Sequence, residues 1–176
     1  MKIGFTGTQS IGKTTLVNAL KETPEFKDYI TRTERSKKLM KMGVPLNTDS
    51  TLKGQTLFLA ERARELMCEN IITDRTVIDV IAFSNASKSM SYLDKEDFSN
   101  YAKNLISEYD HIFYVSPEGV QIEDNGVREI DSEYRDLIDF TIKNILTLYN
   151  HKIKNLHTIS GSTESRIEQV KRAISL

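Results

Sequence analysis

The sequence has little of several features that mark particular classes of protein. Its 176 residues include a single cysteine, Cys68, so no disulfide can form within the chain, which favours a reducing compartment. No apolar run approaches the roughly 18 residues of a membrane-spanning helix. The first residues also lack a charged leader followed by an apolar stretch, the pattern of a secretory signal. We therefore expect a cytoplasmic protein that does not contact a membrane.

Neither the charge nor the histidines indicate a nucleic-acid-binding or zinc protein. The chain carries 24 Lys and Arg against 25 Asp and Glu, a net charge of −1, so only a local basic patch would attract DNA or RNA. The histidines His111, His151 and His157 are scattered, without the short spacings of a zinc site. No repeats or linkers divide the chain. With 39% hydrophobic residues, it is expected to form one domain over residues 1–176.

What the sequence does contain is a phosphate-binding motif at its amino end. An apolar run at residues 1–5 predicts a buried strand. It leads into Gly7-Thr8-Gln9-Ser10-Ile11-Gly12-Lys13-Thr14, and Thr15 follows at the start of an expected helix. This is the spacing G-x-x-x-x-G-K-[ST] between a strand and a helix, the context that the motif requires. The alternative interpretation is a glycine-rich turn that only joins a strand to a helix.

Each part of this motif has a physical reason. Gly7 and Gly12 allow backbone angles that a Cβ would forbid, so residues 7–15 can turn their N–H groups toward phosphate oxygens. The positive end of the following helix dipole favours the same anion. We expect Lys13 to reach the β- and γ-phosphates and the Thr14 hydroxyl to bind Mg²⁺. The motif therefore predicts a site for ATP and Mg²⁺ at residues 7–15.

The rest of the chain alternates strands with helices. Strands are expected at 29–31, 71–74, 111–115 and 156–160, and helices at 14–21, 32–40, 50–69, 77–83, 94–108, 132–149 and from 163 on. Asp49 or Ser50 is expected to cap the helix at 50–69, and Asp94 is expected to start the helix at 94–108. Apolar residues at helical spacing predict buried faces that include Leu52, Met67 and Leu137. The alternation predicts an α/β fold, a parallel sheet covered on both faces, with ligands at the carboxyl ends of its strands.

Charged residues follow two of these strands. Asp74 would hold Mg²⁺ through water or accept a proton from an attacking hydroxyl, or else serve only as a helix N-cap. Arg75 would clamp an acceptor phosphate or orient a sugar, unless it forms a surface ion pair. Glu34 is the other candidate base, or a first-turn glutamate favoured by the helix dipole. Arg35 lies in a basic run that is either a solvated face or a pocket for an anionic acceptor.

A long polar segment at about 117–135 is expected to act as a lid, because loops of this length are unusual in compact domains unless they have a function. It contains Asp124-Asn125-Gly126-Val127-Arg128, and Arg135 follows in the next helix. An arginine delivered by lid closure would neutralise charge on a transferring phosphoryl group. Arg128 and Arg135 are therefore candidate catalytic residues, the alternative being a flexible Asn125-Gly126 turn with incidental arginines.

Taken together, these residues resemble the small P-loop nucleoside and nucleotide kinase-like proteins, the group that includes the ribosylnicotinamide kinase domain and many phage and bacterial "AAA domain" proteins. The stretches that carry the resemblance are residues 7–16, the Glu34 region with 43–47, Thr73-Asp74-Arg75, 124–128 with Tyr134-Arg135, and 159–162 with Arg166.

The resemblance implies a three-layer P-loop NTPase fold, with a five-stranded parallel sheet in the order 2-3-1-4-5. It implies that Gly161 and Ser162 lie against the nucleotide base, and that the acceptor binds between Glu34, the helix after Ser50, and Asp74-Arg75. One departure is Lys37, which stands where the family often has an arginine and which lacks the arginine's two-pronged contact.

Three functions are compatible with these residues. The first is an ATP- and Mg²⁺-dependent kinase for a small-molecule acceptor, a nucleoside, nucleoside monophosphate or related ribosyl compound, acting as a monomer or homodimer. The second is an acceptor-independent NTPase, although the D-x-x-G and N/T-K-x-D strings of a GTPase do not occur. The third is a kinase for a hydroxyl group within nucleic acid, docked by the basic run at 32–38, for which binding would weaken with rising salt.

Overall fold

The computed structural model describes residues 1–33, 36–118 and 132–175. At its centre is a sheet of five parallel strands in the order β2-β3-β1-β4-β5. The strands are β1 (Lys2–Thr6), β2 (Ile30–Arg32), β3 (Ile71–Asp74), β4 (His111–Val115) and β5 (Leu156–Ile159). The helices are α1 (Lys13–Lys21), α2 (Ser36–Lys41), α3 (Leu52–Glu65), α4 (Val77–Ala86), α5 (Tyr92–Ala102), α6 (Ser132–Leu148) and α7 (Thr163–Ala173). The predicted three-layer α/β fold and its strand order are confirmed.

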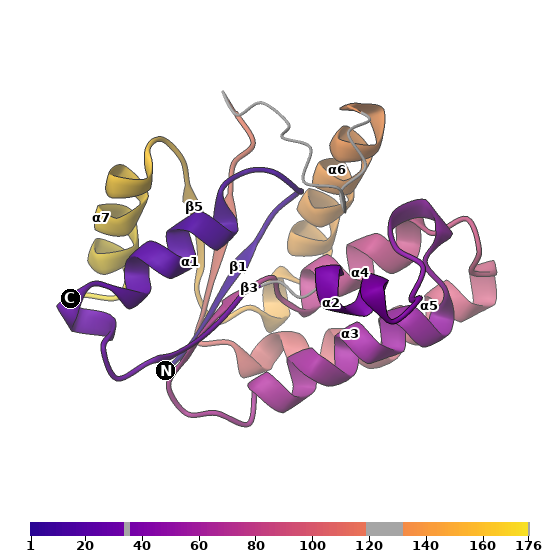
Figure 1. The fold of residues 1–176 in the computed structure, drawn as a ribbon, viewed down its shortest axis with the longest axis horizontal. Coiled ribbons are helices and arrows are strands. Elements are labelled where there is room, and N and C mark those ends of the chain that lie inside the picture. Colours follow the sequence, from indigo (N-terminus) through magenta and orange to yellow (C-terminus); the bar gives the residue numbers. More distant parts are fainter. Residues whose placement is uncertain (34–35, 119–131, 176) are drawn as a thin grey trace.

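Helices cover both faces of this sheet (Figure 1). One apolar cluster joins α1 and α7 to one face, with Leu16, Leu20 and Val170 among its fully buried side chains. A second cluster joins α3, α4, α5 and α6 to the other face. The central strands β1, β3 and β4 are buried on both sides, which is why β3 reads as a continuous run of buried residues rather than as an alternating pattern.

The predicted boundaries of β3 and β4 match the structure, whereas several helix starts do not. Thr51, rather than Asp49 or Ser50, caps α3 by accepting a hydrogen bond from the Gly54 N–H. Ser91 caps α5, and Asp94 is the third residue of that helix, returning a hydrogen bond to the cap in a capping box. In each case the predicted residue lies within three positions of the cap, but local sequence allowed more than one polar candidate.

Other differences concern the ends and faces of the helices. Arg32 belongs to β2 and not to the following helix, while α3 ends at Glu65 rather than near 69. Leu52, Met67 and Leu137 were predicted to be buried, but they are 40%, 84% and 48% exposed. Leu52 is the first residue of α3, and Met67 lies beyond its last residue, Glu65. In the described ranges, no helix has both the length and the apolar content needed to cross a membrane.

Gly4 in β1 allows a large side chain to cross the strand. A Cβ at this position would lie 2.5 Å from Thr76 Cγ2 and 2.8 Å from the ring of Tyr109. The Tyr109 ring is buried there, and its hydroxyl accepts a hydrogen bond from the Val77 N–H at 3.3 Å. Burial raises the pKa of this phenol, so it stays protonated. Gly4 therefore permits the packing that holds the start of α4 against the sheet.

We predict that Gly4→Ala lowers the free energy of unfolding by about 1–3 kcal/mol, because neither the Tyr109 ring nor Thr76 can withdraw without opening the core. Urea denaturation followed by circular dichroism measures this change. An unchanged midpoint would mean that the ring moves aside at no cost.

A histidine pair lies on β4 and β5. The His111 Nδ1 and His157 Nε2 atoms are 3.1 Å apart, and the His157 ring stacks on Phe113 with centroids 4.8 Å apart. Burial lowers the pKa of both imidazoles, and a positive charge on His157 would lower the pKa of His111 further. Asp110 acts in the opposite direction on His111 without cancelling the effect. The folded protein therefore favours both rings in the neutral form.

When folding lowers the pKa of a group, the folded protein loses stability as the pH falls through the pKa that the group has in the unfolded chain. The reason is that the unfolded chain then binds more protons than the folded one. We predict that stability is highest above about pH 6.5 and falls below it. His157→Phe keeps a ring against Phe113 and should flatten this acid-side loss, whereas His151→Phe, at an exposed histidine, should not. Denaturation midpoints between pH 7 and pH 5 test this, and parallel profiles for all three proteins would contradict it.

Candidate functional site

The loop between β1 and α1 has the backbone shape that the motif predicts. Gly7 and Gly12 have φ values of 145° and 82°, and Ser10 adopts a left-handed φ of 58°. A Cβ on Gly7 would lie 2.8 Å from the Val115 carbonyl oxygen, so no larger residue fits. Helix α1 begins without a side-chain cap, which leaves its first N–H groups directed at an incoming anion.

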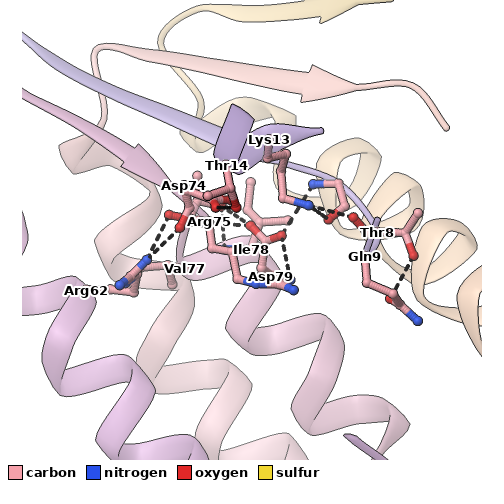
Figure 2. Close-up of polar contacts among 12 residues, drawn as sticks. Thr8, Gln9, Lys13, Thr14, Arg62, Asp74, Arg75, Val77, Ile78 and Asp79 are labelled. Carbon is pink, nitrogen blue, oxygen red and sulfur yellow. Dashed lines mark hydrogen bonds and ion pairs between the residues drawn. The ribbon is translucent and has the colours of Figure 1, made fainter. Parts of the chain in front are cut away.

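The Lys13 side chain lies within this loop. It is 5% exposed, and its Nζ donates hydrogen bonds to the carbonyl oxygens of Gly7 at 2.7 Å and Thr8 at 2.5 Å. Figure 2 shows the ammonium group lying beside the loop backbone. A positive charge is therefore held at the position where the loop would admit phosphate oxygens.

Thr14 and Asp74 meet at the start of α1. The Thr14 hydroxyl donates a hydrogen bond to Oδ2 of Asp74, and the Asp74 side chain is 1% exposed. Its Oδ1 is buried and makes no hydrogen bond to any residue in the described parts of the chain. A buried carboxylate oxygen without a donor, next to a hydroxyl, fits a hard cation such as Mg²⁺.

The alternative role of Asp74 as a helix cap is not what the structure shows. Helix α4 is capped by Thr76, whose hydroxyl accepts from the Ile78 N–H at 3.1 Å. Asp79 completes the capping box by accepting from the Thr76 N–H at 2.7 Å. No group of three His, Cys, Asp or Glu side chains is placed to bind a metal in the described ranges, so a cation here would depend on Asp74, Thr14, water and phosphate oxygens.

Arg75 points from the end of β3 toward α4. Its guanidinium lies 4.7 Å from the centroid of the Phe83 ring and 3.5 Å from Asp79 Oδ1. The Arg75 side chain is only 13% exposed, so the pair with Asp79 is not a surface ion pair. The same Asp79 oxygen accepts a hydrogen bond from the Gly7 N–H at 3.3 Å, which joins Arg75 to the phosphate loop through one carboxylate.

A cleft of about 530 Å³, open to solvent, lies between the phosphate loop, α3 and α4. Its walls are formed by residues of the phosphate loop, α2, the segment before α3, α3, the end of β3 and α4: Gln9, Ser36, Leu46, Asn47, Gln55, Phe58, Arg75, Asp79, Val80 and Phe83. The cleft begins at the phosphate loop, because Gln9 contributes to both. The resemblance places the acceptor in this region, between α3 and the end of β3.

Sequence reasoning missed the α3 and α4 residues of this cleft, of which Gln55 is the most informative. Its side chain is 3% exposed and contributes to the wall of the cleft. Two aromatic rings, Phe58 and Phe83, share the cleft with it. An amide with both donor and acceptor groups, in a cleft that two aromatic rings also line, suits a flat ring with polar edges. The sequence signal that could have identified Gln55 is its position four residues before Leu59, which puts a polar side chain on the buried face of the helix.

The other described candidates lie near the starts of α1, α6 and α7. The Thr8 hydroxyl donates to the Arg135 carbonyl oxygen at 3.0 Å, which places the first turns of α6 beside the loop. Ser162 caps α7 as expected, accepting from the Ser165 N–H at 3.2 Å, and Gly161 has a φ of 91°. Thr15 is exposed on α1.

Arg166 of α7 also contacts the loop, in a role that its local sequence does not reveal. The side chain is 5% exposed and donates a hydrogen bond to the Ile11 carbonyl oxygen at 2.6 Å. A Cβ on Gly12 would lie 3.2 Å from its Nη1. Burial lowers the pKa of this guanidinium. Glu34, Arg35, Arg128 and most of the proposed lid, residues 119–131, lie outside the described residues.

Comparisons with known proteins give the chain a family and a set of structural neighbours. The family model described as "AAA domain" matches residues 2–166. A comparison with curated protein sequences found no match.

Solved structures of similar fold include a deoxyadenosine kinase from M. mycoides with dCMP and dCDP bound as products, with a TM-score of 0.69 at 17% identity, covering 99% of this chain and 98% of that one. YorR from Bacillus subtilis has a TM-score of 0.58 at 15% identity, covering 99% and 95%. NadR in complex with NR has a TM-score of 0.74 at 16% identity, and the match covers 99% of this chain but 51% of NadR.

We predict that Lys13→Ala removes most of the thermal stabilisation given by a non-hydrolysable ATP analogue with Mg²⁺, because the loop loses its buried positive charge. Lys21→Ala, at the far end of the same helix, is the matched control and should respond like the original protein. Differential scanning fluorimetry over a range of analogue concentrations makes the measurement. Equal shifts for Lys13→Ala and the control would refute the role of Lys13.

Proposed function

The chain belongs to the AAA domain family whose model it matches over residues 2–166, and from that premise we propose that it is a small-molecule kinase. It transfers the γ-phosphoryl group of ATP, with Mg²⁺, to a hydroxyl group of a nucleoside or related ribosyl compound. The observation that carries this proposal is the cleft that begins at the phosphate loop and is lined by aromatic rings of α3 and α4. A hydrolase that uses only water needs no such second chamber.

In this proposal, residues 7–15 bind the triphosphate of ATP, and Lys13 neutralises charge on its β- and γ-phosphates. Thr14 and Asp74 hold Mg²⁺, which would supply neutralisation of the transferring group. Gly161 and Ser162, in the turn before α7, lie near the nucleotide base. Arg135, in α6, would neutralise the phosphoryl group, and we propose the same role for Arg128.

The acceptor occupies the cleft, with its ring against the aromatic side chains Phe58 and Phe83 and its polar edge on the Gln55 amide. Arg75 and Asp79 then lie between that ring and the phosphate loop, where they would bind the sugar hydroxyls. Asp74 or Glu34 accepts the proton of the attacking hydroxyl; the proposal leaves both candidates in place.

The charges of the described lining favour a nucleoside over a nucleoside monophosphate. Arg75 is the cationic side chain among the described lining residues, and Asp79 already lies against it. An acceptor phosphate would need that cation to leave its carboxylate, whereas a neutral sugar can donate to Asp79 and accept from Arg75 together. The names of the similar deoxyadenosine kinase and of the NadR complex with NR support an acceptor of this class.

The direct test is phosphoryl transfer from ATP with Mg²⁺ to a panel of nucleosides, mononucleotides and nicotinamide riboside, followed by chromatography of the products. Transfer to a nucleoside or riboside supports the proposal. Acceptor-independent ATP hydrolysis as the only turnover would overturn it in favour of an NTPase. Transfer only to DNA or RNA, lost at high salt, would overturn it in favour of a nucleic-acid kinase.

We predict that Gln55→Leu raises the acceptor KM by about tenfold or more, since the acceptor ring loses hydrogen bonds each worth about 1 kcal/mol. The KM for ATP should not change, because Gln55 lies on the α3 wall of the cleft. Thr56→Val, at the exposed neighbouring position of α3, is the control. Steady-state kinetics with each substrate varied makes the comparison, and a KM effect on ATP alone would contradict the placement of the acceptor.

A further inference from the structure

Helix α3 carries a buried ion pair that the proposed reaction does not itself require. Arg62 and Glu65 are 3% and 1% exposed. Their contact has two points: Arg62 Nη2 donates to Glu65 Oε1 at 3.1 Å, and Arg62 Nε lies 3.1 Å from Glu65 Oε2. Burying two charges is costly, and a buried pair is weak evidence of added stability. The pair therefore calls for another explanation.

The same guanidinium reaches out of its helix to the end of β3. Arg62 Nη1 donates hydrogen bonds to the carbonyl oxygen of Asp74 at 3.2 Å and to that of Arg75 at 3.1 Å. Figure 2 shows Arg62 with both contacts, on the opposite side of Asp74 and Arg75 from Lys13. Glu65 fixes the orientation of the guanidinium, so its remaining N–H groups face these two carbonyls.

The backbone that Arg62 contacts is strained. Arg75 has a φ of 85°, a left-handed conformation that costs free energy in a residue with a Cβ. Such a conformation persists when its surroundings hold it in place. The Arg75 N–H donates to the Phe5 carbonyl oxygen at 2.9 Å, and Arg62 holds the carbonyl on the other side. The residue is thus fixed at both of its backbone polar groups.

This conformation sets the direction of two functional side chains. It sends the Arg75 guanidinium over the Phe83 ring and toward Asp79, inside the cleft, while Asp74 one residue earlier faces Thr14. An ordinary extended or helical φ at Arg75 would send its side chain in another direction. Gln55 lies seven residues before Arg62, two turns along the same helix, so one element both lines the cleft and contacts the backbone of Arg75.

We propose that Arg62, held by Glu65, is a positioning residue for the acceptor: it maintains the left-handed turn at Arg75 and so aims Arg75 into the cleft beside Asp74. This rests on the proposed kinase function for its kinetic consequence, but not for its structural one. Arg62 acts through the backbone and does not contact the acceptor.

The test replaces the pair as a unit, with Arg62→Met and Glu65→Leu in the same chain, because apolar replacement of both partners leaves no buried charge unpaired. We expect a folded protein with unchanged affinity for the ATP analogue, an acceptor KM raised tenfold or more and a lower kcat. The control is Lys171→Met with Glu25→Leu, which removes a pair 2.9 Å apart between α7 and the Glu25 segment. It should keep the original acceptor kinetics. A folded Arg62/Glu65 double variant with those kinetics would overturn the proposal.

Arg62→Lys is the second variant, and it carries the test if the double variant does not fold. Lysine keeps the charge opposite Glu65 but lacks the planar set of donors that reaches a carboxylate and two carbonyls at once. We expect the raised acceptor KM to persist with a melting temperature close to the original. An original acceptor KM in this variant would overturn the proposal.

A crystal structure of whichever variant is folded separates this proposal from the proposed function. We expect Arg75 to leave the left-handed region and its guanidinium to leave Phe83. Unchanged Arg75 geometry would refute the positioning role even if no acceptor were found. Failure of the original protein to phosphorylate any acceptor would instead refute the proposed function alone.

Discussion

The parallel pairing of β1 with β3 is the constraint on which the site depends. It sets Phe5 beside Asp74 in the sheet, and the Arg75 N–H continues the pairing to the Phe5 carbonyl oxygen at 2.9 Å. Two residues after Phe5 the chain turns at Gly7 into the phosphate loop. Because the two strands end side by side, the hydroxyl at the start of α1 meets the carboxylate at the end of β3. A shift of one residue in this register would send Asp74 to the opposite face of the sheet.

The phosphate loop and the cleft meet at the ends of β1 and β3. The phosphate loop is held by α7 through Arg166 and by α6 through the Arg135 carbonyl oxygen. The cleft is built from α3 and α4. Asp79 joins the loop and the cleft, since one of its oxygens contacts the Gly7 N–H and Arg75 while the other caps α4 through Thr76. A change at this carboxylate would therefore disturb the loop, the cleft and a helix start together.

Local patterns were sufficient for the parts of the protein that are contiguous in sequence. The phosphate loop was predictable because its glycines, lysine and threonine act through their own backbone and nearest neighbours. β3 and β4 were predicted with their observed bounds because strands buried on both faces are short apolar runs. Helix starts were less certain, since Ser, Thr and Asp compete as caps within a few residues, as at Thr51 and Ser91. The sequence also predicted Asp74 and Arg75 as site candidates, because residues at strand ends gather at one edge of a parallel sheet.

By itself, then, the sequence determined the α/β class, the phosphate loop and the acidic strand end, all of which follow from spacing along the chain. Only the tertiary structure decided the cleft that we propose for the acceptor, and the contacts that support it. Gln55, Phe58 and Phe83 come from two helices whose facing sides depend on packing. Arg62 donates to the carbonyl oxygens of residues 12 and 13 positions further along the chain. The left-handed φ of Arg75 could not be predicted from the sequence, because the residue is not a glycine. The physical reason is that burial, strain and hydrogen bonding between separate elements exist only once the elements have met.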